Sequence, residues 1–134
     1  MSNLADLNIH GNQETGVSKI SVDPTSKIIC VSSIGLNTKS IVDAHFAHLK
    51  TVVDNERRTH GIARVLLDLQ GALVNPPEVA SQIRTLSEAV YRPGDRVAVI
   101  NLTTLLKLQA KRVAFPHHRI FEDERQAMEW LTAP

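Results

Sequence analysis

Aliphatic residues gather in short runs that alternate with longer amphipathic stretches along this chain. The clearest run, residues 64–71, is rich in aliphatic residues and closes with Asp68 and Gly71, shortly before a helix signal. This pattern is typical of a strand buried on both faces of an α/β sheet. In open α/β sheets the carboxyl ends of the strands are where ligands usually bind, so the run predicts where a site lies.

The rest of the pattern predicts a hairpin followed by repeated strand–helix steps. Residues 17–22 alternate between polar and apolar, residues 23–26 form a type I turn signal, and residues 27–33 return as a deeper strand. The elements expected after the hairpin are a helix from Asn37 or Thr38 to near Gly61, a strand at 63–69, a helix at 75–90, a strand at 96–100, a helix from 101, a strand at 118–121 and a helix from 123. We therefore predict an α/β fold with a mixed sheet of about five strands and right-handed crossovers.

Three polar residues are predicted to cap helices. Asn75 precedes two prolines and Glu78, Asn101 precedes a leucine-rich stretch, and Asp123 stands three residues before Gln126 in a capping box. Each would satisfy backbone N–H groups that the first helical turn leaves unpaired.

Length and charge limit the kinds of protein that fit. The 134 residues suit one domain, which we assign to residues 16–134, whereas residues 1–15 are weakly patterned and predict a loose arm or an edge strand. Fifteen Lys and Arg against fourteen Asp and Glu leave a net charge of +1, so we expect neither nucleic acid nor an anionic membrane as an obligate partner.

The single cysteine and the length of the apolar runs indicate in which cellular compartment the protein resides. Cys30 alone excludes an internal disulfide and fits reducing conditions. No apolar run approaches the roughly 18 residues that span a bilayer, and no basic-then-apolar leader opens the chain. We expect a cytoplasmic protein without a membrane span. An unpaired strand edge near the amino terminus would also permit a homodimer.

Histidine spacing gives little support for a metal. His45 and His48 could present two imidazoles to one ion, but no third ligand is evident nearby, and we interpret both as a solvated flank of their helix. His117 and His118 follow Pro116 into a strand, where neighbouring side chains point to opposite faces. We therefore predict no metal site.

Catalytic and cofactor motifs are missing as well. Cys30 lies among Ile and Val, which indicates a buried, unreactive thiol. The six glycines are dispersed and form neither a dinucleotide nor a phosphate loop, and serine-hydrolase motifs are absent. We expect no cofactor, and we expect that the chain is not an enzyme.

A weaker hypothesis concerns polar residues at the strand exits. We interpret Asp68 first as a turn acceptor near Gly71, and alternatively as a general base or ligand contact. Helix amino termini at the same edge would attract anions. The candidate small-ligand residues are Asp68, Asn75, Asn101, Thr103 and Thr104.

A second candidate site is an apolar loop. Leu73, Val74, Pro76 and Pro77 fall between a strand and a helix rather than inside an element. Exposed apolar loops often mark partner sites, so these residues predict binding of a protein partner.

Three segments of the chain carry a resemblance to a known family, namely residues 64–72, 95–100 and 117–131. They resemble the STAS superfamily, specifically small stand-alone bacterial proteins similar to the stage II sporulation protein AA, an anti-sigma-factor antagonist. The stretch from Phe121 to Leu131 is the most specific, and the resemblance covers about residues 16–132. It implies a sheet with helices mainly on one face. It also implies a non-enzymatic protein-interaction and regulatory module.

The resemblance has two further implications, a phosphorylated serine and a role in carrying lipids. Regulatory members are phosphorylated on a serine at the start of the helix after the central strand, but residues 70–77 contain no Ser or Thr and Ser81 lies one turn inside the helix. We therefore assign no phosphorylation site. Relatives also resemble lipid-carrier domains in outline, which gives the alternative function of binding or carrying a small apolar ligand or lipid.

Overall fold

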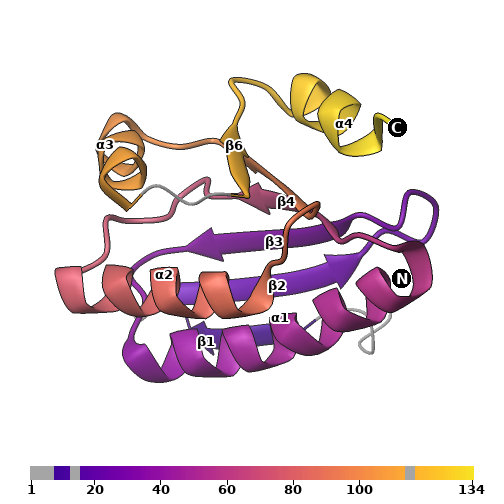
Figure 1. The fold of residues 1–134 in the computed structure, drawn as a ribbon. Coiled ribbons are helices and arrows are strands. Elements are labelled where there is room, and N and C mark those ends of the chain that lie inside the picture. The colour runs from indigo at the N-terminus through magenta and orange to yellow at the C-terminus, as the bar shows by residue number, and fades with distance from the viewer. Residues whose placement is uncertain (1–7, 13–15, 114–116) are drawn as a thin grey trace.

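A six-stranded mixed sheet organises the molecule (Figure 1). The computed structural model describes residues 8–12, 16–113 and 117–134. Its strands are β1 Asn8–Asn12, β2 Gly16–Val22, β3 Ile29–Ile34, β4 Arg64–Asp68, β5 Arg96–Ile100 and β6 His118–Ile120. Its helices are α1 Lys39–His60, α2 Pro77–Val90, α3 Thr104–Val113 and α4 Glu124–Thr132.

The strands follow one another across the sheet in chain order. β1, β2 and β3 pair antiparallel, and β3, β4, β5 and β6 pair parallel. In the central pair Arg64 lies opposite Arg96 and Asp68 opposite Ile100, so β4 and β5 end at the same edge. The predicted α/β fold with its hairpin and its shared strand edge is confirmed, and β1 adds a strand to the five expected.

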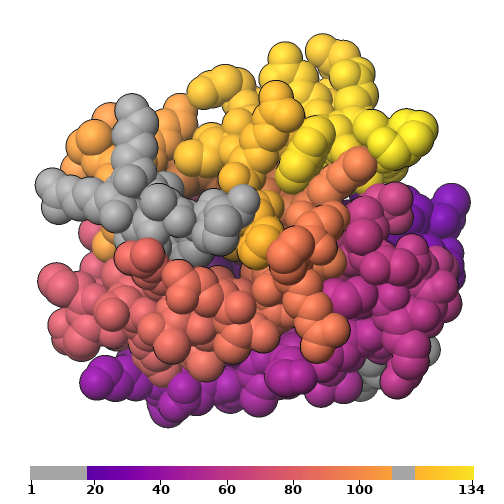
Figure 2. Space-filling model, viewed as in Figure 1, coloured from indigo at the N-terminus to yellow at the C-terminus, as the bar shows by residue number. Residues whose placement is uncertain are grey.

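The helices form layers on both faces of the sheet. α1 and α2 lie side by side below it and α4 lies above it, as Figure 1 shows, while α3 stands beside the edge at which β3 and β4 end. In Figure 2, α1 and α2 make up the lower part of the surface. The resemblance implied helices mainly on one face. Two helices do share a face, and α4 covers the opposite one.

Alternation along the strands explains the two layers. Val65 of β4 packs in a core with α1 and α2, whereas the neighbouring Leu66 packs with Ala127 and Leu131 of α4. Since successive side chains of a strand point to opposite faces, a run that is apolar throughout must be covered on both sides. Burying one such Val or Leu side chain contributes about 1.5–3 kcal/mol.

Some predicted helix ends are confirmed and others are wrong. The Thr38 hydroxyl accepts from the Ile41 N–H at 3.3 Å, Gly61 ends α1 at a φ of 88°, and Asp123 caps α4. Asn75 does not cap α2, which begins at Pro77 without a side-chain cap. Asn101 does not cap α3 either.

The reason at Asn101 is its backbone. Its φ of 61° places it in the left-handed region, which Asn tolerates but which cannot start a right-handed helix. The chain turns there, and α3 begins later, where the Thr103 hydroxyl accepts from the Leu106 N–H at 3.2 Å.

A buried ion pair ties the two helices α1 and α2 to the sheet. Nη2 of Arg57 lies 2.5 Å from Oδ2 of Asp95 and donates to the Val90 carbonyl at 2.9 Å. Asp95 also accepts from the N–H groups of Ala63 and Arg92, each at 2.9 Å. Burial by itself raises the pKa of Asp95, but these hydrogen bonds and the charge of Arg57 outweigh burial and hold the pKa below 3.8.

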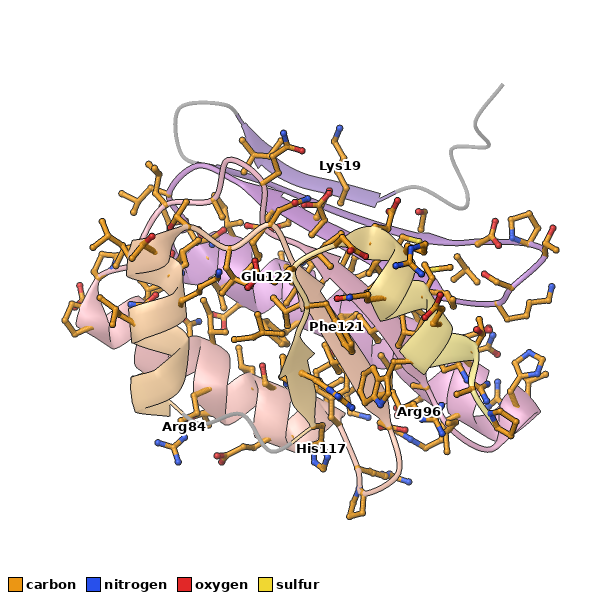
Figure 3. All side chains as sticks on the ribbon, turned by 90° about the horizontal axis from the view of Figure 1, so that it is seen from above. Lys19, Arg84, Arg96, His117, Phe121 and Glu122 are labelled. Atoms are coloured by element: carbon orange, nitrogen blue, oxygen red, sulfur yellow. The ribbon has the colours of Figure 1, made fainter. Side chains whose placement is uncertain are left out.

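On the opposite face, Arg96 and Phe121 lie against α4 (Figure 3). The Arg96 guanidinium donates to the carbonyls of Trp130 and Ala133 at 2.8 and 2.5 Å. Phe121 and Trp130 are in ring contact, with centroids 5.5 Å apart. A cation at a helix carboxyl end satisfies carbonyls that the last turn leaves free, so Arg96 fixes where α4 ends.

Candidate functional site: an uncharged cavity between the sheet and its helices

A cavity of about 300 Å³ lies between the sheet and the helices α1, α2 and α3. Its floor is the sheet face that points toward α1 and α2, with Val31, Leu67 and Val99 contributed by β3, β4 and β5. Leu69, just after β4, extends this floor. Helix side chains close it from the other side, among them Phe46, Ile83 and Leu106. Pockets for small molecules are commonly of this size and are lined mainly by apolar side chains.

Charge is missing from the cavity wall. Among the described residues, no Asp, Glu, Lys or Arg lines it. The polar side chains in the wall are amides, hydroxyls and imidazoles, which include Ser18, Ser33, Asn37, His45, Asn75 and His118. The wall therefore suits an apolar molecule and offers a few positions for hydrogen bonds.

One polar group lies where β2 meets β3. Ser18 and Ser33 are directly opposite each other in the antiparallel ladder, and both line the cavity. Side chains of such a pair stand about 4.5–5.5 Å apart at Cβ on one face of the sheet. His45 of α1 lines the same cavity and is 8% exposed, with its ring edge against Phe46.

A second polar group lies on the β6 side. His118 of β6 meets the ring of Tyr91 edge-on, with centroids 5.5 Å apart. Burial, helped by the nearby His117, lowers the pKa of His118 to about 4. Burial also raises the pKa of Tyr91. Both side chains are therefore neutral near pH 7.

The predicted small-ligand residues separate into two places. Oδ1 of Asp68 accepts from the N–H of Gln70 and from Nδ2 of Asn101, each at 2.9 Å. Asp68 thus acts as the turn acceptor that we inferred, and Asn101 joins it. Thr103 and Thr104 are exposed at the start of α3. None of these four residues lines the cavity.

Asn75 lies apart from that group and belongs to the cavity wall. Its side-chain oxygen accepts from Nδ2 of Asn37 at 3.4 Å, and its carbonyl accepts from Nε2 of Gln109 at 3.2 Å. Asn75 therefore connects the segment before α1 with α3 instead of capping α2.

The predicted partner loop is exposed in its first half. Leu73 and Val74 are 56% and 40% exposed, whereas Pro76 is half-buried and Pro77 already belongs to α2. The N–H of Leu73 donates to the carbonyl of Gly35, so this loop runs beside the loop after β3. Exposed Ile34 is the last residue of β3, and exposed Leu36 lies in the loop after it. We name Ile34, Leu36, Leu73 and Val74 the loop patch.

Sequence reasoning missed most of the cavity wall. His45 was expected on a solvated flank, and this prediction is wrong because the side chain turns inward beside Phe46. Its spacing from Val42 and Leu49, at three and four residues, places it next to the apolar line of α1 and was the available signal. Ser18 and Ser33 gave no signal, since only the strand register brings them together.

Comparison with known proteins identifies the fold. No family model and no curated protein matches the chain. Among solved structures it is similar to the crystal structure of an uncharacterised protein of the DUF3478 family with a SpoIIAA-like fold, from Shewanella loihica PV-4. The two are 23% identical with a TM-score of 0.59, over 92% of this chain and 99% of that chain.

The chain therefore has a SpoIIAA-like fold, which is the fold that the sequence resemblance implied. Within the described ranges, no helix combines the length and the hydropathy of a bilayer-spanning segment.

Proposed function

We propose that this chain is a non-enzymatic binding protein that holds a small apolar ligand in the cavity between its sheet and α1, α2 and α3. The observation that supports this proposal most strongly is the composition of the cavity wall, in which aliphatic and aromatic side chains from strands and helices surround about 300 Å³. His45, Tyr91 and His118 are titratable groups in this wall, but most of the wall is apolar contact area.

The size of the cavity bounds the affinity. Taking roughly 30 Å³ per atom, the share of a water molecule in the liquid, the cavity holds about ten non-hydrogen atoms. Burying a CH₂ group is worth about 0.8 kcal/mol, so an eight-carbon chain gains about 6 kcal/mol before the costs of association. We expect dissociation constants between about 0.1 mM and 1 mM for ligands of this size.

Calorimetry tests the proposal. Octan-1-ol at about twenty times its dissociation constant should stabilise the folded state by roughly 1.8 kcal/mol, because it binds the native cavity and not the unfolded chain. Differential scanning calorimetry should then show a Tm higher by about 5–8 °C. Ethanol at an equal concentration cannot fill the cavity and is the control. A Tm that octan-1-ol leaves unchanged or lowers as ethanol does would contradict ligand binding.

The loop patch supports a second candidate function, docking of a protein partner as a regulatory module. Its four apolar side chains come from the end of β3 and from two adjacent loops, and they are between 40% and 56% exposed. Apolar side chains that gather on a surface in this way often mark partner sites.

Introducing negative charge into the loop patch tests this second function. We expect the double substitution Leu73→Asp and Val74→Asp to abolish capture of a specific partner from the native cytoplasm, since two carboxylates would be desolvated in the interface. Leu105→Asp is the matched control, because Leu105 is 65% exposed on α3 outside the loop patch. Partner capture that survives the double substitution would exclude the loop patch as the interface.

A further inference from the structure

The wall of the cavity restricts the charge of what it can hold. Among the described residues, the wall contains no Asp, Glu, Lys or Arg side chain. A carboxylate or ammonium group taken into such a cavity loses its hydration and finds no acidic side chain, lysine or arginine with which to pair. The cost of desolvating a charged group therefore disfavours charged ligands, whatever their shape.

His118 does not supply the missing positive charge. Its burial keeps the pKa near 4, so the imidazole is neutral at pH 7 and can exchange hydrogen bonds but cannot pair with an anion. Tyr91 beside it is likewise held in its neutral form by burial. The side chains at the β6 end of the cavity therefore also favour an uncharged ligand.

The β2–β3 end offers a specific polar contact. Oγ of Ser33 is buried and has no hydrogen-bond partner among the described residues. Ser33 faces the cavity next to Ser18, its partner across the ladder. A buried hydroxyl left without a partner is costly, so an oxygen atom of a ligand at this point would be favoured.

The sheet also fixes the shape of the space. The cavity runs over Ser33 of β3, Leu67 of β4, Val99 of β5 and His118 of β6. Three steps between neighbouring strands, at about 4.8 Å each, make a span of roughly 14 Å. A volume of about 300 Å³ along such a span is narrow and suits a chain-like molecule better than a compact one.

We propose that the ligand is an uncharged, elongated molecule of about ten non-hydrogen atoms whose hydroxyl or carbonyl oxygen hydrogen-bonds to Oγ of Ser33. This inference rests on the proposed function and specifies its ligand class. Medium-chain alcohols, aldehydes and ketones have this chemistry, and ionised fatty acids and alkyl amines do not.

A series of eight-carbon compounds separates the two levels of the proposal. Isothermal titration at pH 7 should show binding of octan-1-ol and at least about tenfold weaker binding of octanoate and octylammonium, because their charges would be buried unpaired. Octanoate that binds within twofold of octan-1-ol would overturn the neutral-ligand inference and leave ligand binding intact. Failure of all three compounds to bind the folded protein would overturn both.

The contact with Ser33 has its own variant and control. Ser33→Ala should weaken octan-1-ol binding about three- to tenfold, the worth of one hydrogen bond. Ser32→Ala is the matched control. Ser32 is the preceding residue of β3, so its side chain points to the other face of the sheet, and it does not line the cavity. Equal affinities of the two variants would overturn the assigned role of Ser33.

Discussion

Replacing Asp95 by Asn is expected to lower the free energy of unfolding by about 3–5 kcal/mol. The Asp95 side chain is 2% exposed and its partner Arg57 is 12% exposed. The substitution therefore removes the buried counter-ion of Arg57 and leaves it only the more exposed carboxylate of Asp54, 3.0 Å from Nη1. Two backbone N–H groups, of Ala63 and Arg92, lose charged acceptors at the same time. Because Arg57 also holds the Val90 carbonyl, the damage extends to the end of α2.

Urea denaturation measures this loss, and the chain provides a matched control. Arg84 and Glu88 form an ion pair on α2 whose side chains are about half exposed. Glu88→Gln removes the same charge as Asp95→Asn, yet an exposed pair at this helical spacing contributes only about 0.3–0.5 kcal/mol. Similar losses in the two variants would show that burial does not set the strength of the Arg57–Asp95 pair.

The same pair predicts a dependence of stability on pH. The pKa of Asp95 is lower in the folded protein than its ordinary value near 3.8. The stability that this depression contributes is therefore complete above the unfolded-state pKa and is lost as the pH falls through the folded-state value. Tm measured between pH 6 and pH 2 should decrease below about pH 4 in the wild type, and Asp95→Asn should lack that part of the decrease.

Much of the fold could be predicted because its signals are local. The apolar run at 64–69 and the shorter one at 96–100 are each complete within a few residues, and both become parallel neighbours in the sheet. The ends of α1 follow from Thr38 and Gly61, whose roles depend only on their own turn of helix.

The cavity could not be predicted, because it depends on distances between elements. Ser18 and Ser33 are fifteen positions apart in the sequence and meet only through the register of β2 and β3. Asn75 looked like a helix cap from its neighbours, but Asn37 and Gln109 approach it from distant segments and use its polar groups instead. Periodicity identifies which residues are buried and does not reveal where packing leaves space.

The second large effect is expected from filling that space. Ala80 of α2 lines the cavity, so Ala80→Phe should place its ring among the apolar side chains and exclude a ligand. We expect octan-1-ol affinity to fall at least about thirtyfold, since most of the burial of its alkyl chain would be lost. Because the added ring occupies space that is already open, the variant should keep its stability or gain about 0.5–2 kcal/mol.

Ala89→Phe is the control for this variant. Ala89 lies on the same helix and is exposed, so its ring would reach solvent and leave the cavity unchanged. We expect wild-type affinity for octan-1-ol. Had the space under Ala80 been fully packed, Ala80→Phe would instead cost about 1–3 kcal/mol of stability.

Methyl NMR during titration with octan-1-ol measures these effects where they occur. The methyl signals of Leu67 and Ile83, which line the cavity, should shift in the wild type and in Ala89→Phe and stay in place in Ala80→Phe. Those of Leu66 and Leu131, in the core beneath α4, should not move in any of the three. Shifts confined to the α4 core, or no shifts at Leu67 and Ile83 in the wild type, would contradict a ligand site between the sheet and α1, α2 and α3.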